Sequence, residues 1–158
     1  MLPSPLHIVL VEPEIPPNTG NIGRLCVGAG VELHLVEPLG FSLDDRSLKR
    51  AGLDYWDHLN LTVWPSFDAY LAASLRADWR MFALSTKARF SYTDAEFRPG
   101  DHLLFGRETK GLPDPFLRGG RVHSFRIPMR PEARSYNLAT AVGIVLFEGL
   151  RQINAMPQ

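Results

Sequence analysis

The feature that most constrains the fold is a short apolar run near the N-terminus, residues 6–11. Five of its six residues, Leu-His-Ile-Val-Leu-Val, are apolar, and they do not alternate with polar residues as they would in a strand with one face in water. Such a run is typical of a strand that is buried on both faces, as in a parallel sheet covered by helices.

Strand-like and helix-like segments alternate along the rest of the chain. We expect further strands at residues 31–36, 61–64, 80–84, 101–105 and 123–127. We expect helices from Asn18 or Thr19 to Gly30, from a Ser42–Asp45 capping box to about Gly52, after Ser66 with Phe67, Tyr70, Leu71 and Leu75 inward, and over about 136–153. This order predicts an α/β fold with a mainly parallel sheet, in a single domain spanning residues 1–158.

Composition and charge exclude several classes of protein. Lys+Arg and Asp+Glu are both 17, so a nucleic-acid signal has to come from local clusters and not from the net charge. A lone cysteine, Cys26, excludes an intrachain disulfide and fits a reducing compartment. No signal peptide is evident, and the longest apolar stretch, residues 138–150, is too short to span a bilayer, so we expect a soluble cytoplasmic protein. The five histidines show no metal-ligand spacing, and no metal is expected.

In parallel sheets, ligands bind outside the carboxyl ends of the strands. The segment 105–113 follows such an end and has the GxxxxG spacing of a phosphate loop, but Leu112-Pro113 stands where that loop needs Lys-Ser/Thr. The dinucleotide pattern GxGxxG is also missing, because Leu33 occupies its third glycine position. The segment is therefore either a charged tight turn or a loop whose glycines let its backbone approach a ligand.

Two other segments follow predicted strands. Ser135 can cap the last helix, whose N-terminus suits an anionic or carboxylate ligand. Five arginines and one acid lie between residues 118 and 134, which indicates either phosphate contacts or a solvated face. Residues 18–24 contain Arg24, which is either a surface charge or a functional group on a helix whose entry is stiffened by Pro16-Pro17.

Together, these segments resemble the SPOUT superfamily of knotted RNA methyltransferases, and within it the TrmL/YibK-like group that methylates the ribose of the tRNA wobble nucleotide. Asn18, Gly20 and Arg24 match its first motif, N-x-G-x-x-x-R. Residues 105–112, with Glu108, match the second, and Ile127-Pro-Met129 followed by Ser135-x-Asn137-Leu138 match the third. Residues 12–21 and 50–55 resemble signatures of this group. The resemblance extends from about Leu6 to Gln152.

The resemblance implies a C-terminal deep trefoil knot and S-adenosylmethionine as methyl donor, without a metal. By resemblance, adenosine would contact the backbone of Leu84, Gly106, Ile127 and Met129. Ser135 and Leu138 would close the pocket, Thr86 and Glu108 would lie near it, and Asn137 would order the loops. The family assigns activation of the 2′-hydroxyl to Arg24, which we interpret as an electrostatic aid because arginine is not a ready base.

The same resemblance implies a homodimer in which each active site uses both chains, so Arg24 serves either its own or the partner's donor. The final helix is apolar on more than one side, which fits either a subunit contact or full coverage within one chain. The expected substrate is tRNA, gripped at the anticodon stem-loop by Lys87, Arg107, Lys110, Arg130 and Arg134. The alternatives are ribose methylation at another tRNA position or on rRNA, and a knotted RNA-binding dimer without turnover.

Overall fold

The computed structural model describes residues 3–158, except for the side chains of Lys49 and residues 51–54. The elements follow in the order β1 (His7–Val11), α1 (Pro16–Ala29), β2 (Glu32–Val36), α2 (Arg46–Gly52), the 3₁₀ helix η1 (Leu53–His58), β3 (Leu61–Trp64), α3 (Phe67–Ala77), β4 (Met81–Leu84), β5 (Phe90–Ser91), η2 (Tyr92–Asp94), β6 (His102–Phe105), α4 (Asp114–Arg118), β7 (His123–Arg126) and α5 (Leu138–Gln152).

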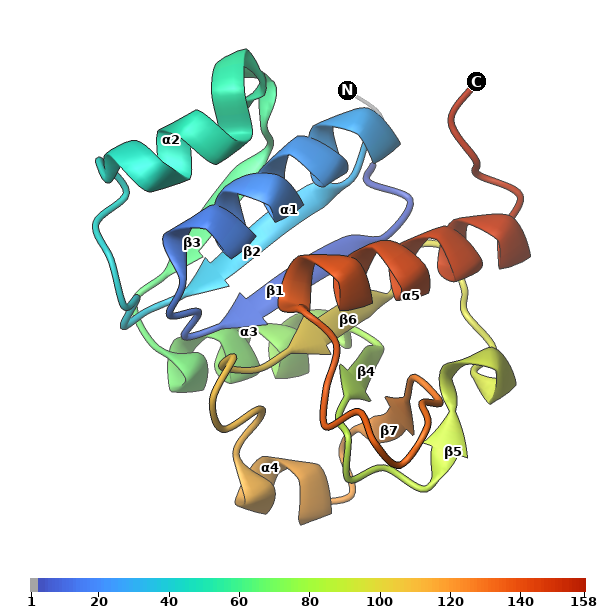
Figure 1. The fold of residues 1–158 in the computed structure, drawn as a ribbon. Coiled ribbons are helices and arrows are strands. Elements are labelled where there is room, and N and C mark those ends of the chain that lie inside the picture. The colour runs from blue at the N-terminus through green and yellow to red at the C-terminus, as the bar shows by residue number, and fades with distance from the viewer. Residues whose placement is uncertain (1–2) are drawn as a thin grey trace.

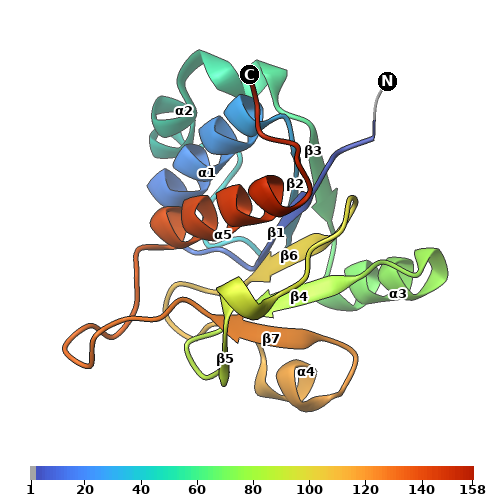
Figure 2. The ribbon, with the colours of Figure 1, turned by 90° about the vertical axis from the view of Figure 1, so that its right-hand side faces the viewer.

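The strands form one seven-stranded sheet in the order β3-β2-β1-β6-β4-β7-β5, and every pair in it is parallel. This confirms the predicted α/β class and the parallel sheet. Helices α1 and α5 cover one face of the sheet, whereas α3 and α4 lie on the other side (Figures 1 and 2). Among the described residues, no helix has the length and apolar character needed to cross a membrane.

The alternation of side chains along β1 builds two cores. Ile8 and Leu10 belong to a cluster that includes Ile22 of α1 and Val142 of α5. The intervening Val9 and Val11 belong to a second cluster that is organised around Tyr70 of α3, which is fully buried. Because successive side chains of a strand point to opposite faces, one nearly apolar strand supplies both cores. The expectation that β1 is buried on both faces is therefore confirmed.

Helix starts are where the sequence prediction is least accurate. Helix α1 begins at Pro16 and not after Asn18 or Thr19, because prolines suit the first helical positions, where no N–H bond is lost. Asp45 accepts bonds from the N–H groups of residues 47 and 48 at the start of α2, in place of a Ser42–Asp45 capping box. Asn137 caps α5 through Thr140 N–H, a role predicted for Ser135.

Of the other local predictions, some are confirmed and some are wrong. Gly30 ends α1 as predicted, and it adopts the left-handed conformation, at φ 71°. Ser66 caps α3 through Ala69 N–H at 3.0 Å, also as predicted. Leu75 of α3, however, is 68% exposed and does not join the core. The two-residue strand β5 was not predicted, because a segment this short has no recognisable periodicity.

Candidate functional site

A cavity of about 1030 Å³ lies at the carboxyl ends of β1, β4 and β6. Its walls come from the loop after β6, the loop between β7 and α5, and the start of α1. The structure places all nine residues that were predicted to hold the donor around this cavity, namely Leu84, Thr86, Gly106, Glu108, Ile127, Met129, Ser135, Asn137 and Leu138. Three stretches that lie far apart in the sequence thus share one hollow.

A chain of polar contacts ties these stretches together. The Glu108 carboxylate accepts bonds from the N–H groups of Glu14 at 2.8 Å and Ile15 at 2.9 Å, and from Asn18 Nδ2 at 3.3 Å. Asn137 Nδ2 then donates to Asn18 Oδ1 at 2.9 Å. Both Glu108 oxygens therefore accept hydrogen bonds from residues at and just before the start of α1. Glu108 thus joins the loop after β6 to the start of α1. The sequence placed Glu108 near the donor but did not indicate this contact.

The loop after β6 also donates hydrogen bonds to the segment before α1. Glu14 Oε1 accepts bonds from the Thr109 hydroxyl at 2.8 Å and the Thr109 N–H at 3.1 Å, and these bonds lower the pKa of Glu14. Each of the two segments thus supplies a carboxylate for backbone N–H groups of the other. Such reciprocal bonds fix the position of both loops at the cavity mouth.

Gly106 stands at the point where β6 enters this loop. A Cβ at Gly106 would lie 2.1 Å from the carbonyl carbon of Gly111 and 2.2 Å from the nitrogen of Leu112. The loop closes this tightly because Arg107 and Gly111 form an antiparallel bridge, and Gly111 has φ 68°. Backbone therefore packs against backbone, and the cavity wall at this point is made of peptide groups.

Arg24 is not among the residues that line the cavity. It lies on the exposed face of α1, and its guanidinium carbon is 5.2 Å from the centroid of the Tyr55 ring. The 3₁₀ helix η1, which carries Tyr55, packs closely against α1. A Cβ added at Gly23 of α1 would lie only 2.8 Å from the Trp56 ring of η1. Tyr55 thus stacks on Arg24, a role that sequence analysis missed although residues 50–55 were singled out.

The predicted RNA-binding cations are distributed unevenly around the cavity. Lys87, Arg107, Lys110 and Arg134 line it, but Arg130 does not. Two of the four are already paired, because Lys87 Nζ lies 2.9 Å from Asp114 Oδ1 and Arg107 forms an ion pair with Glu12. The hydrogen bond from Lys87 lowers the pKa of Asp114.

The arginines between residues 118 and 134 differ in their surroundings, and the single basic cluster expected from the sequence stays a prediction. Arg121 Nη2 donates to Ser74 Oγ on α3 at 3.2 Å, and Arg118 lies 3.8 Å from Asp114. Of the five, only Arg134 lines the cavity.

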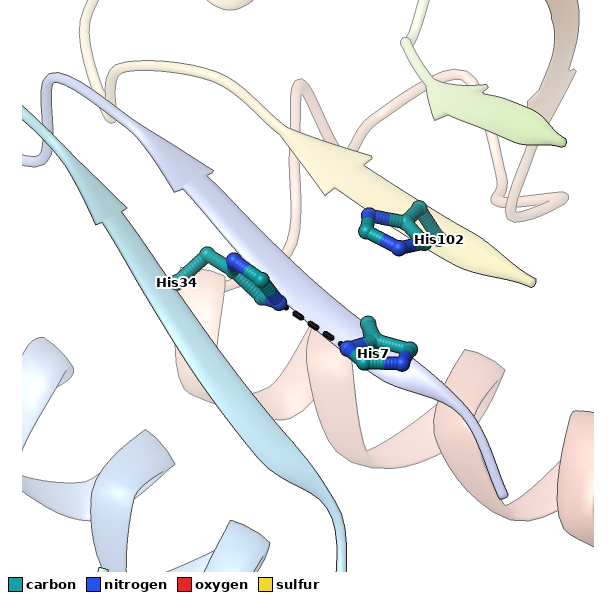
Figure 3. A group of neighbouring side chains, drawn as sticks. All are labelled: His7, His34 and His102. Atoms are coloured by element: carbon teal, nitrogen blue, oxygen red, sulfur yellow. Dashed lines mark hydrogen bonds between the residues drawn. The ribbon is translucent and has the colours of Figure 1, made fainter. Parts of the chain in front are cut away.

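A second group of side chains lies on the sheet outside the cavity, where His7, His34 and His102 come together on β1, β2 and β6 (Figure 3). His7 Nδ1 lies 2.9 Å from His34 Nε2, and Trp64 Nε1 donates to His34 Nδ1 at 3.0 Å. Burial lowers the pKa of His34 to about 4 and that of His102 to about 2. The sequence missed this group, because the three residues come together only through strand pairing.

These buried histidines predict acid sensitivity. Below the ordinary pKa of 6.5, the unfolded chain takes up protons that the folded rings refuse, so the free energy of unfolding falls as the pH drops from 6.5 toward 4. His34 alone accounts for a loss on the order of 3 kcal/mol. Urea titrations at pH 7 and pH 4.5 measure this loss, which should be smaller in a His34→Gln variant. An equal loss in that variant would contradict the assignment.

Comparison with known proteins gives consistent matches. The model of the SpoU rRNA Methylase family matches residues 5–147. The tRNA (cytidine(34)-2'-O)-methyltransferase of Aeromonas hydrophila is 50% identical over 149 residues, 94% of each chain. A solved structure concerned with 2-OH methylation of C/U34 on tRNA has a TM-score of 0.89 at 48% identity, and the match covers 96% of this chain and 97% of that chain. An AdoMet-bound rRNA methyltransferase from Sinorhizobium meliloti has a TM-score of 0.84 at 25% identity, over 95% of this chain and 57% of that chain.

Proposed function

The chain belongs to the SpoU methylase family, and from this premise we propose that it transfers a methyl group from S-adenosylmethionine to the ribose 2′-hydroxyl of the nucleotide at position 34 of tRNA. The nucleoside at this position, which is the wobble position, is cytidine or uridine. The observation that carries the proposal is the single cavity at the carboxyl ends of the strands, in which all three sequence motifs meet. We place this activity in the cytoplasm.

The cavity fits S-adenosylmethionine in size and in chemistry. Leu84, Ile127, Met129 and Leu138 supply an apolar slot suited to a purine, and the peptide groups at Gly106 supply donors and acceptors beside it. Ser135 lines the same cavity from the loop before α5. When bound, S-adenosylmethionine supplies an electrophilic methyl group on a sulfonium sulfur. The protein's task is to hold the ribose hydroxyl in line with that methyl group.

We further propose that the enzyme is a homodimer in which Arg24 acts at the cavity of the partner subunit. Its position on the exposed face of α1, outside its own cavity, supports this arrangement. A guanidinium there orients a phosphate and stabilises the charge that develops on the attacking oxygen. We also propose that the segment from Ile127 into α5 threads a trefoil knot, within a single domain of residues 1–158.

The proposed tRNA contact is an anticodon stem-loop gripped at the cavity rim. Lys110 and Arg134 lie on that rim, and Arg130 lies in the same loop as Arg134. Within the described part of the chain, none of these three takes part in an ion pair, so their charges remain available for phosphates. Lys87 and Arg107 would first have to exchange their carboxylate partners for phosphate.

Mass spectrometry of nucleosides tests the proposed activity. The purified protein is incubated with labelled S-adenosylmethionine and with tRNAs that carry cytidine or uridine at position 34. The expected product is 2′-O-methylation at that position only, and the same mark should be missing from tRNA of a deletion strain. A mark at another tRNA position or on rRNA would reassign the substrate. Donor binding without any methyl transfer would indicate a non-catalytic RNA-binding protein.

Tyr55 is expected to position Arg24 for this reaction. Removing the ring in Tyr55→Ala should lower kcat roughly twofold to fivefold, the value of a cation–π contact at an exposed site, whereas Tyr55→Phe should retain nearly full activity. KM for the donor should stay unchanged in both variants, because the ring lies outside the cavity. Steady-state kinetics separate these quantities. Equal losses in the two variants would show that the phenol oxygen matters and not the ring face.

A further inference from the structure

The three clustered histidines lie toward the amino end of the sheet, opposite the cavity. His7 and His102 are the first residues of β1 and β6 and pair in register, and His34 pairs with Val9. Because residues two apart on a strand share a face, all three rings lie on the same face of the sheet. Glu32 pairs with His7 and shares that face, so it brings a carboxylate to the group.

Donor atoms of this group lie at the spacing of ligands around one metal ion. His7 Nδ1 is 2.9 Å from His34 Nε2, and the Glu32 carboxylate oxygens are 3.5 Å from His7 Nδ1 and 3.6 Å from His34 Nε2. With zinc–ligand bonds of 2.0–2.2 Å, two ligands of a tetrahedral site are about 3.3 Å apart. The two ring nitrogens and the two carboxylate oxygens therefore surround a point that can hold such an ion without a large movement of any strand.

We propose that His7, His34 and Glu32 bind a divalent transition-metal ion of the zinc type. The ion would take the place of the proton between His34 Nε2 and His7 Nδ1, and the His34 ring would stay neutral by carrying a proton on Nδ1 instead, with no net release of a proton. Imidazole and carboxylate ligands suit zinc, and one carboxylate offsets part of its charge. A site joining β1 to β2 would stabilise the sheet and is independent of the proposed methyl transfer.

The site is open on one side. The His7 and Glu32 side chains are 18% and 28% exposed, whereas His34 is 4% exposed. A surface hollow lined by Ser4, Asn60 and the same His7 and Glu32 leads to it, so the ion can enter and keep a water as its fourth ligand.

His102 is the neighbour of the proposed ligands and not one of them in this arrangement. Its ring stacks on His7 at 4.3 Å with an interplanar angle of 15°, so an ion in the plane of one ring lies off the plane of the other. Its Nδ1 lies 2.9 Å from the Tyr70 hydroxyl, and its buried Nε2 has no hydrogen-bond partner among the described residues. The stacked ring of His102 therefore restricts the orientation of the His7 ring.

The hydrogen bond from Trp64 to His34 is expected to weaken metal binding. An indole N–H can only donate, so His34 Nδ1 must accept from it, and the neutral ring carries its proton on Nε2. Metal binding at Nε2 displaces that proton and would leave Nδ1 to take one up, which conflicts with the indole N–H. Trp64→Phe removes this conflict, and zinc affinity should rise.

Calorimetry with zinc sulfate on tag-free, chelator-treated protein tests the proposal, and cobalt(II) absorption reports a tetrahedral site. We expect one ion per chain, at least tenfold weaker binding in His7→Asn and in Glu32→Gln, and tighter binding in Trp64→Phe. His58→Ala and His123→Ala, which alter histidines outside the group, should bind as the wild type does. Circular dichroism establishes that each variant is folded. Absence of binding in the wild type, unchanged binding in folded His7→Asn, or no gain in Trp64→Phe would overturn the assignment.

Discussion

Replacing Arg24 with alanine is expected to lower the rate of methyl transfer by about two to three orders of magnitude, the usual effect of removing one group that stabilises developing charge. Donor affinity should remain within about twofold of the wild type, because Arg24 does not line the cavity. Single-turnover kinetics and calorimetry with S-adenosylmethionine measure the two quantities separately. A variant that also loses donor binding would contradict the position of Arg24 outside the pocket.

In the proposed homodimer, mixed dimers of two variant chains decide which cavity Arg24 serves. One chain carries Arg24→Ala with an intact cavity, and the other carries Gly106→Ala with an intact Arg24. If the guanidinium acts across the subunit interface, each heterodimer has one complete site, and a statistical mixture recovers roughly a quarter of the wild-type activity. If Arg24 acts on its own chain, no complete site exists and the mixture stays at the low activity of the two parent variants. The measurement is the activity of co-refolded chains against the two parent variants.

The sequence alone predicts features that depend on local patterns. The apolar run of β1, the end of α1 at Gly30 and the Ser66 cap of α3 each need only a few neighbouring residues, and each prediction is confirmed. Pro16 shows where local reasoning fails, because a proline pair indicates a stiff loop although the first turn of a helix accommodates it equally well. Because α1 begins at Pro16, Asn18 does not cap this helix, and its side chain forms hydrogen bonds with Glu108 and Asn137.

Features of the site that depend on distant contacts could not be predicted in the same way. The hydrogen bonds from the Glu14 N–H to the Glu108 carboxylate and from Asn137 Nδ2 to Asn18 Oδ1 join residues 94 and 119 positions apart. The residue types were identified by their motifs, but their use as a frame follows from the parallel sheet, which brings the ends of β1 and β6 to one edge. Strand register likewise assembles His7, His34 and His102, so spacing along the chain could not reveal them.

The largest effect on donor binding is expected from Gly106→Ala. The added methyl group would meet the backbone of Gly111 and Leu112 at 2.1–2.2 Å, well inside any tolerable contact. No flexible side chain can move aside there, so the loop itself has to shift and its Arg107–Gly111 bridge has to open. Overpacking of this kind costs about 1–3 kcal/mol of stability. Donor affinity should fall at least tenfold, because the displaced peptides form one wall of the cavity.

Gly28→Ala is the matched control, because a Cβ at Gly28 in helix α1 would meet nothing within 4 Å. Alanine is the better helix former by roughly 1 kcal/mol, so this variant should be at least as stable as the wild type and should bind S-adenosylmethionine equally well. Thermal unfolding and calorimetry on both variants give the comparison. If Gly106→Ala is folded and binds the donor as tightly as Gly28→Ala does, the loop after β6 is not part of the donor site. The proposed location of S-adenosylmethionine would then have to be abandoned, whereas the fold and the contacts of Glu108 would stand.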